Sequence, residues 1–135
     1  MPDAGHMQIG EVAERTGLSL RTIRYYGEVG LVEPSARSRG GFRLYTEQDV
    51  DRLQLIKRMK PLDFSLEETR ELLDSLDRLS AAGTGLDERE ALGERLDAFE
   101  AAIAARCRAL HDQLAMAEEF AGRLREQRAR HNATV

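Results

Sequence analysis

Residues 18–26 read Leu-Ser-Leu-Arg-Thr-Ile-Arg-Tyr-Tyr, and this stretch decides the fold. Ser19 is a good N-cap, so we expect a helix that begins here and runs to about Val29. An apolar face over 8–15 predicts an earlier short helix, which Thr16-Gly17 ends because glycine is the usual left-handed helix stop. Two short helices joined by a tight turn that contains glycine predict a helix-turn-helix.

The second of these helices carries side chains suited to double-stranded DNA. A major groove accepts one helix, whose N-terminal residues reach the base edges. Arginine binds guanine or phosphate, and a tyrosine hydroxyl donates to a phosphate oxygen. We assign Ile23 and Tyr26 to the core. The predicted DNA-facing residues are Arg21, Thr22, Arg24 and Tyr25. The competing interpretation is a solvated helix face without a DNA role.

The residues that follow predict a small β-hairpin with a basic tip, which we call the wing. Strand-like residues at 31–33 and 42–45 flank a loop at 34–41 that contains Pro, Ser and two adjacent glycines. The glycines let the tip approach a phosphate backbone closely, and the arginines neutralise it. The predicted contacts of the wing with the DNA backbone are Arg37, Arg39, Arg43 and Tyr45.

A third helix is expected after Thr46, which is a good N-cap. Apolar residues recur at three-residue steps over 50–59, and the helix should end before Pro61, because the residue ahead of a proline disfavours helical geometry. Lys60 stands at this end. It either stabilises the helix C-terminus or contacts a DNA phosphate, and the sequence favours neither.

A fourth helix is expected to begin with a capping box formed by Ser65 and Glu68, and to run to about Leu79. Its inward residues are predicted to be Leu66, Thr69, Leu72, Leu73 and Leu76. The small residues over 80–86 predict a linker. The expected fold class is therefore mainly α with a small β-hairpin, in which residues 7–79 form a winged helix-turn-helix domain.

Residues 87–130 contain no proline and predict one long helix that pairs two copies of the chain. Its apolar residues follow a heptad pattern with one extra residue between Ile103 and Cys107. The predicted dimerisation residues are Leu96, Phe99, Ile103, Cys107, Leu110 and Leu114. We interpret Cys107 as a small packing residue. The alternative is a thiol switch, or a metal site between subunits with His111, if two helices overlap fully and antiparallel.

Charge and composition narrow the function classes. Residues 7–60 hold ten basic and seven acidic residues, a net charge of +3, whereas residues 61–135 hold ten basic and sixteen acidic residues, a net charge of −6. A basic half joined to an acidic half is typical of a DNA reader with a separate module. No signal peptide or membrane span is expected, and a single cysteine fits a reducing cytoplasm. Neither an enzyme site, a cofactor nor a metal motif is predicted.

Residues 8–76 resemble the DNA-binding domain of the MerR family of bacterial transcription regulators. The matching segments, in order, are Ile9-Gly-Glu-Val-Ala13, Thr22-Ile-Arg-Tyr-Tyr26, Gly30-Leu31, Gly41-Phe-Arg-Leu-Tyr45 and Phe64-Ser-Leu-Glu-Glu68. The resemblance implies a homodimer joined by an antiparallel coiled coil, and a palindromic operator within a promoter. It also implies that the DNA is distorted so that RNA polymerase engages both promoter elements.

This sequence departs from the family pattern in two places: the approach to the fourth helix, and the region where some members sense their effector. Pro61-Leu-Asp-Phe64 replaces the more usual Leu-Gly-Phe approach to the fourth helix. Residues 75–87 lack the cysteines that metal- and redox-sensing members carry there, so the sequence does not identify the effector. A small effector would have to bind around residues 62–86.

Two other function classes remain at this stage. An architectural or excisionase-like DNA binder uses a similar winged helix but usually has no long dimerisation helix. A coiled-coil protein whose head binds protein would show no steep salt dependence of DNA affinity.

Overall fold

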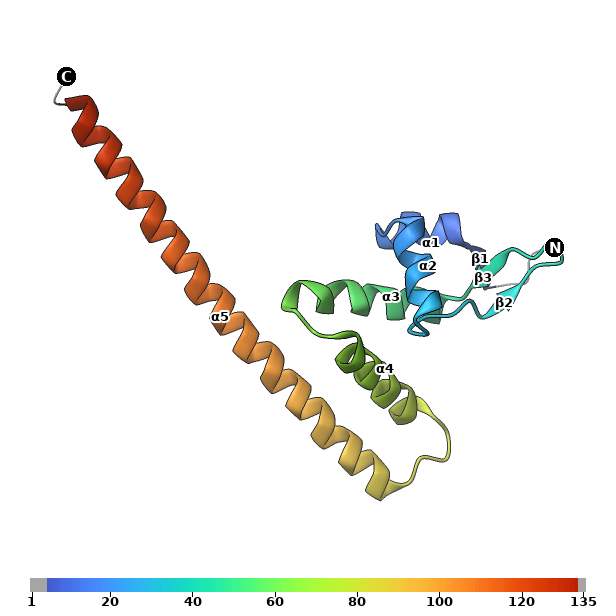
Figure 1. Cartoon of the computed structure of the whole chain (residues 1–135). Helices are drawn as coiled ribbons and strands as arrows, with labels where there is room; N and C mark the ends of the chain where they lie inside the picture. The colour runs from blue at the N-terminus through green and yellow to red at the C-terminus, as the bar shows by residue number, and fades with distance from the viewer. Residues whose placement is uncertain (1–4, 134–135) are drawn as a thin grey trace. The chain divides into compact units, whose positions relative to one another are not determined.

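The computed structural model describes residues 5–133, which divide into two compact units on either side of the boundary between Leu92 and Gly93. The first unit, the head, contains every strand and four α-helices of the described chain, together with the start of a fifth (Figure 1). The elements are β1 (Met7–Gln8), α1 (Ile9–Thr16), α2 (Leu20–Glu28), β2 (Ala36–Arg37), β3 (Arg43–Tyr45), α3 (Glu47–Met59), the 3-10 turn η1 (Lys60–Leu62), α4 (Leu66–Ser80) and α5 (Leu86–Ala133).

The predicted helix-turn-helix is confirmed, and its turn has a clear physical basis. Gly17 adopts a left-handed conformation with φ of 74°, and its amide donates to the carbonyl oxygen of Ala13. A Cβ at Gly17 would lie 3.0 Å from Nζ of Lys57, which itself donates to the carbonyl oxygen of Thr16 at 2.7 Å. Ser19 then caps α2 by accepting from the amide of Thr22. The left-handed conformation therefore favours glycine at residue 17, and any side chain there would also displace the Lys57 ammonium group.

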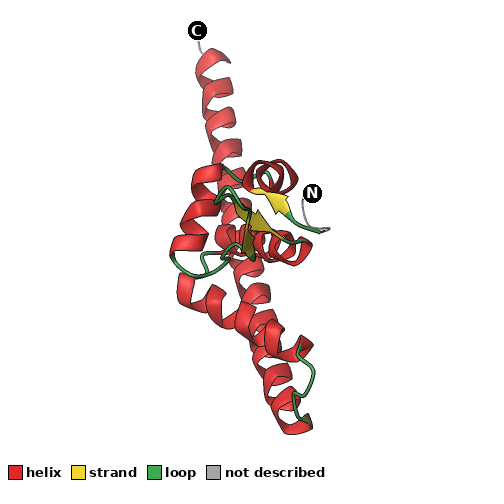
Figure 2. Ribbon diagram, turned by 90° about the vertical axis from the view of Figure 1, so that its right-hand side faces the viewer, coloured by secondary structure: helices red, strands yellow, loops and turns green. Residues whose placement is uncertain are grey.

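The wing is present, but its first strand is not where the sequence predicted it. The three-stranded antiparallel sheet has the order β1-β3-β2, and Ala36 pairs with Leu44. Figure 2 shows strands of this sheet in yellow among the red helices. Residues 31–33, which were predicted to form the first strand of the hairpin, are not a strand, and Leu31 and Val32 lie in the buried core. The two-residue strand β1 was not predicted, because so short a segment carries no periodic signal.

One apolar core holds the head together. Val12, Ile23 and Leu53 are fully buried, and they bring α1, α2 and α3 into a single cluster. The predicted three-residue periodicity of α3 is confirmed, since Val50, Leu53, Ile56 and Met59 all lie inside. The bidentate ion pair between Arg15 and Glu47, with N–O distances of 2.5 and 2.6 Å, also links α1 to the start of α3.

The connection from α3 to α4 follows the sequence closely. Helix α3 ends at Met59, and Pro61 lies in η1. Ser65 and Glu68 form the predicted capping box at the start of α4. One detail of α4 was predicted wrongly: Leu66 is 40% exposed rather than inward, because its side chain lies on the rim of a cavity described below.

The second unit, residues 93–133, is the greater part of α5. None of its residues is buried in the single chain, and Cys107 is exposed. A 48-residue helix is about 70 Å long at 1.5 Å per residue. Within residues 5–133, no helix combines the length and the apolar character needed to cross a membrane.

Candidate nucleic-acid interface

Helix α2 separates its side chains into a buried side and an exposed side. Ile23 and Tyr26 are buried in the head, as predicted. Arg21 and Arg24 are exposed, and Tyr25 is 44% exposed. Of two adjacent tyrosines, the structure therefore leaves one ring accessible to a ligand. The rings of Tyr25 and Tyr26 lie 5.7 Å apart between centroids, so the buried ring also supports the exposed one.

Thr22 lies at the N-terminus of α2 and already has a structural role. Its hydroxyl oxygen accepts a hydrogen bond from the Ser19 hydroxyl at 2.8 Å, and its amide donates to the same Ser19 oxygen. These bonds satisfy the first turn of the helix. They also hold the side chain half-buried, so a base contact by Thr22 stays a prediction.

The tip of the wing is a tight and well-bonded turn. Ser38 makes most of its bonds: its carbonyl accepts from the amide of Gly41, its amide donates to the carbonyl of Phe42, and its hydroxyl accepts from the Phe42 amide. Arg37 donates to the carbonyl of Gly41 at 3.2 Å, and Arg39 is exposed at the tip. The structure thus brings these two predicted arginines together with the half-buried Arg43 on one short hairpin.

Phe42 is a wing residue that our reasoning from the sequence passed over. Its side chain is 61% exposed, and a Cβ at Gly40 would lie 3.1 Å from the ring. An aromatic residue beside two glycines in a basic loop is a signal that could have identified it.

The prediction for Tyr45 is wrong. The side chain is completely buried, and its strand pairs with β1, so that Tyr45 lies opposite Met7. Burial raises the pKa of the Tyr45 hydroxyl, and the nearby positive charges of Arg43 and Arg24 oppose that rise. A DNA phosphate cannot reach this hydroxyl, so Tyr45 supports the wing from inside instead of contacting DNA.

The two lysines at the end of α3 differ in role. Lys57 is tied to the carbonyl of Thr16 and holds the end of α1. Lys60 is exposed, and its backbone amide closes α3 by donating to Ile56. Its ammonium group is therefore accessible to an anion, whereas that of Lys57 is engaged by the protein.

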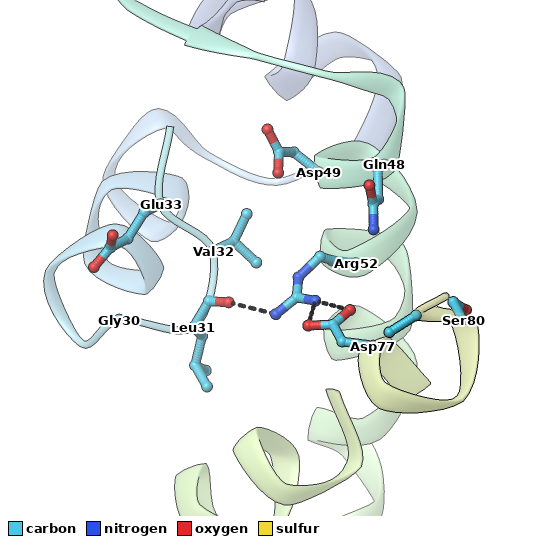
Figure 3. Close-up of a pocket in the computed structure, with 10 residues that line it drawn as sticks. Gly30, Leu31, Val32, Glu33, Gln48, Asp49, Arg52, Asp77 and Ser80 are labelled. Carbon is cyan, nitrogen blue, oxygen red and sulfur yellow. Dashed lines mark hydrogen bonds and ion pairs between the residues drawn. The ribbon is translucent and has the colours of Figure 1, made fainter. Parts of the chain in front are cut away.

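A cavity of about 560 Å³ in the head is an open cleft in which Arg52 is paired with Asp77 (Figure 3). Nη1 of Arg52 lies 2.6 and 2.5 Å from the two carboxylate oxygens of Asp77, and Nη2 donates to the carbonyl of Leu31 at 3.3 Å. Asp49 accepts from Ser35 and from the backbone of Thr46. The cleft joins the segment after α2 to α3 and the end of α4, and these contacts give it a structural role.

The alternative interpretation of Cys107, a metal site with His111 between two subunits, needs two copies of α5 and is not tested by one chain. Within 5–133, no three His, Cys, Asp or Glu side chains come together in a way that could hold a metal ion. Cys107 and His111 are both exposed on α5, one helical turn apart.

Comparison with known proteins gives consistent matches. A family model described as MerR HTH family regulatory protein matches residues 7–76, and one described as MerR, DNA binding matches residues 50–117. ZntR of Escherichia coli (strain K12), an HTH-type transcriptional regulator, is 42% identical over 97 residues, which cover 72% of this chain and 68% of ZntR. The mercuric resistance operon regulatory protein of Bacillus cereus is 46% identical over 71 residues, which cover 53% of this chain and 54% of that protein.

Several solved structures are similar over most of the chain, and one of them has promoter DNA bound. It is HiNmlR, described as a MerR family regulator lacking the sensor domain and bound to promoter DNA. The two chains are 26% identical with a TM-score of 0.52, and the match covers 78% of each. This chain spans between about half and two thirds of the two curated relatives named above.

Proposed function

Because the chain belongs to the MerR family of transcription regulators, we propose that it binds a palindromic operator in a promoter as a homodimer. The observation that carries the proposal is the exposed side of α2. Arg21, Arg24 and Tyr25 are accessible there, while Ile23 and Tyr26 anchor the same helix in the core. A helix that is packed against the core on one side and carries exposed basic residues on the other is suited to enter a major groove.

The wing and Lys60 supply the expected contacts to the flanking DNA backbone. The wing presents Arg37, Arg39 and Arg43 on a turn that is held by hydrogen bonds. Phosphate contacts of this kind fix the position of the protein on the duplex and carry most of the non-specific affinity.

In this proposal, α5 pairs with α5 of a second copy of the chain, which covers the apolar residues of the second unit. Leu110, Leu114 and Leu124 are each about half exposed, although they belong to the heptad pattern of the sequence. A two-fold dimer presents two heads and matches a palindromic operator. An architectural DNA binder without a promoter function is not favoured, because it would not need a helix of 48 residues.

We further propose that the dimer distorts its operator, and that it acts in the cytoplasm with RNA polymerase at the same promoter. Bending a site of this size costs about 1–6 kcal/mol, and contacts from two wings would offset that cost. HiNmlR, which is similar over most of the chain, was crystallised on promoter DNA, and this supports the proposal.

The test begins with selection of genomic fragments by the purified full-length protein, followed by anisotropy on the selected operator at several salt concentrations. We expect a linear fall of log affinity with log salt. Arg24→Ala should cost about 1–3 kcal/mol of binding free energy at each half-site and leave the dimer intact. Arg128→Ala, an exposed arginine near the end of α5, is the control and should bind normally. Loss of the dimer in Arg24→Ala would contradict our assignment of this face.

A further inference from the structure

A second cavity in the head differs in kind from the open cleft. It has a volume of about 270 Å³ and lies between α2, the end of α3 and the start of α4. We call it the tyrosine pocket. The lining residues on which the argument depends are Tyr25, Tyr26, Lys60, Phe64, Leu66 and Thr69.

The rim of the tyrosine pocket is apolar and accessible. Tyr25 is 44% exposed and Leu66 is 40% exposed, although both are large apolar side chains on well-packed helices. They come from segments 41 residues apart in the chain, and both border this cavity. A planar apolar ligand that covered both side chains would remove this surface from water, which is favourable in proportion to the area covered.

The charge of the pocket selects the class of ligand. Among the described residues that line it, Lys60 is the sole charged side chain, and none carries a carboxylate. The hydroxyl of Thr69 is already used, since it donates to the carbonyl of Ser65 at 2.8 Å. In the open cleft, by contrast, the single arginine is neutralised by Asp77. An ammonium group at the edge of an aromatic cavity favours a ligand that is both aromatic and anionic.

We propose that the tyrosine pocket binds a small aromatic carboxylate, and that this ligand is an effector of operator binding. The second half of the statement rests on the proposed function. Tyr25 and Lys60 are predicted DNA contacts, so a carboxylate held between them would compete with the DNA backbone. By linkage, ligand and operator must then weaken each other's binding by the same factor.

The first experiment uses the full-length protein without DNA and follows backbone amides by NMR. The probes are 1-naphthoate, the neutral 1-naphthamide and the cationic 1-naphthylmethylamine. We expect saturable shifts at residues 64–69 and at Tyr25 with naphthoate, weaker binding of the amide, and none of the amine. Absence of saturable shifts with naphthoate, or equal binding of the amine, would overturn the proposal.

Variants then test the two features separately. Lys60→Gln should lower the affinity for naphthoate about tenfold, to that of the amide, because one charge-assisted hydrogen bond is lost. Arg58→Gln is the matched control, because Arg58 is an exposed cation two residues before Lys60, on the last turn of α3, and does not line the pocket. Leu66→Ser should weaken naphthoate and naphthamide alike. Equal effects of Lys60→Gln and Arg58→Gln would overturn the role of Lys60.

A competition experiment separates this proposal from the proposed function. At naphthoate concentrations ten times its Kd, the apparent operator affinity should fall by about tenfold or more. If naphthoate binds and the protein selects no operator, the proposed function fails and the pocket stands. If an operator is found but naphthoate leaves its affinity unchanged, the effector role fails while the proposed function stands.

Discussion

The head and the second unit use apolar residues in opposite ways. In the head, fifteen apolar side chains, from Met7 to Leu92, are buried within one chain. In residues 93–133 no side chain is buried, and the large apolar ones include Leu114 at 56% exposure. The head is therefore complete by itself, whereas an isolated helix is stabilised mainly by what it packs against. The large apolar residues of this helix therefore stay accessible in the single chain, in keeping with the proposed pairing of two copies.

The largest effect is expected in the core of the head. Leu53→Ala removes a fully buried side chain and should lower the free energy of unfolding by about 2–5 kcal/mol. Urea unfolding of the full-length protein measures it. Leu20→Ala, at an exposed position on α2, should change stability by less than about 1 kcal/mol. Similar losses of unfolding free energy in the two variants would contradict the assignment of Leu53 to the core and Leu20 to the surface.

The next effect is on assembly. Leu114→Glu places a charge in the predicted dimerisation seam, so sedimentation should give a monomer, while the helical content of the head stays unchanged. Met116→Glu is the matched control, because Met116 is 71% exposed on the same helix but outside the heptad pattern. A dimer that tolerates Leu114→Glu but not Met116→Glu would show that the seam is on another face of α5.

A smaller effect is expected at the open cleft. Asp77→Asn removes the carboxylate that binds Arg52, and the pair is partly exposed to solvent, so the loss should be about 1 kcal/mol or less. The change in urea midpoint should exceed that of Glu88→Gln, because Glu88 lies 3.8 Å from Arg78 in a more exposed pair. An unchanged midpoint in Asp77→Asn would mean that the cleft is held by packing alone.

The smallest effect is a pH dependence at the surface of the head. Arg15 holds the pKa of Glu47 below its ordinary value of 4.5 through their hydrogen bonds. Because the pKa is lower in the folded state, the pair stabilises the head above pH 4.5, and this contribution is lost as the pH falls through the folded value. Glu47→Gln should flatten this part of the curve of urea midpoint against pH. An unaltered curve would assign the acid sensitivity to other carboxylates.

Local signals in the sequence predicted much of the head and the accessible position of most residues in the candidate interface. N-caps at Ser19, Thr46 and Ser65 act within one helical turn, so each could be identified without knowledge of the fold. The assignment of Tyr26 to the core and Tyr25 to the surface succeeded for a similar reason, because helical spacing placed Tyr26 and Ile23 on one face.

The sequence by itself thus determined the helices, their caps and the exposed side of α2, because these depend on residues a few positions apart. Only the tertiary structure decided whether the side chains of Tyr45 and Leu66 are buried or exposed. Tyr45 is buried in the apolar core, on a strand that pairs with β1, 38 residues earlier in the chain. Leu66 is exposed because the first turn of α4 stands at the rim of the tyrosine pocket. The burial of a side chain depends on which segments, distant in the sequence, pack together in the fold. A pattern of a few neighbouring residues does not contain that information.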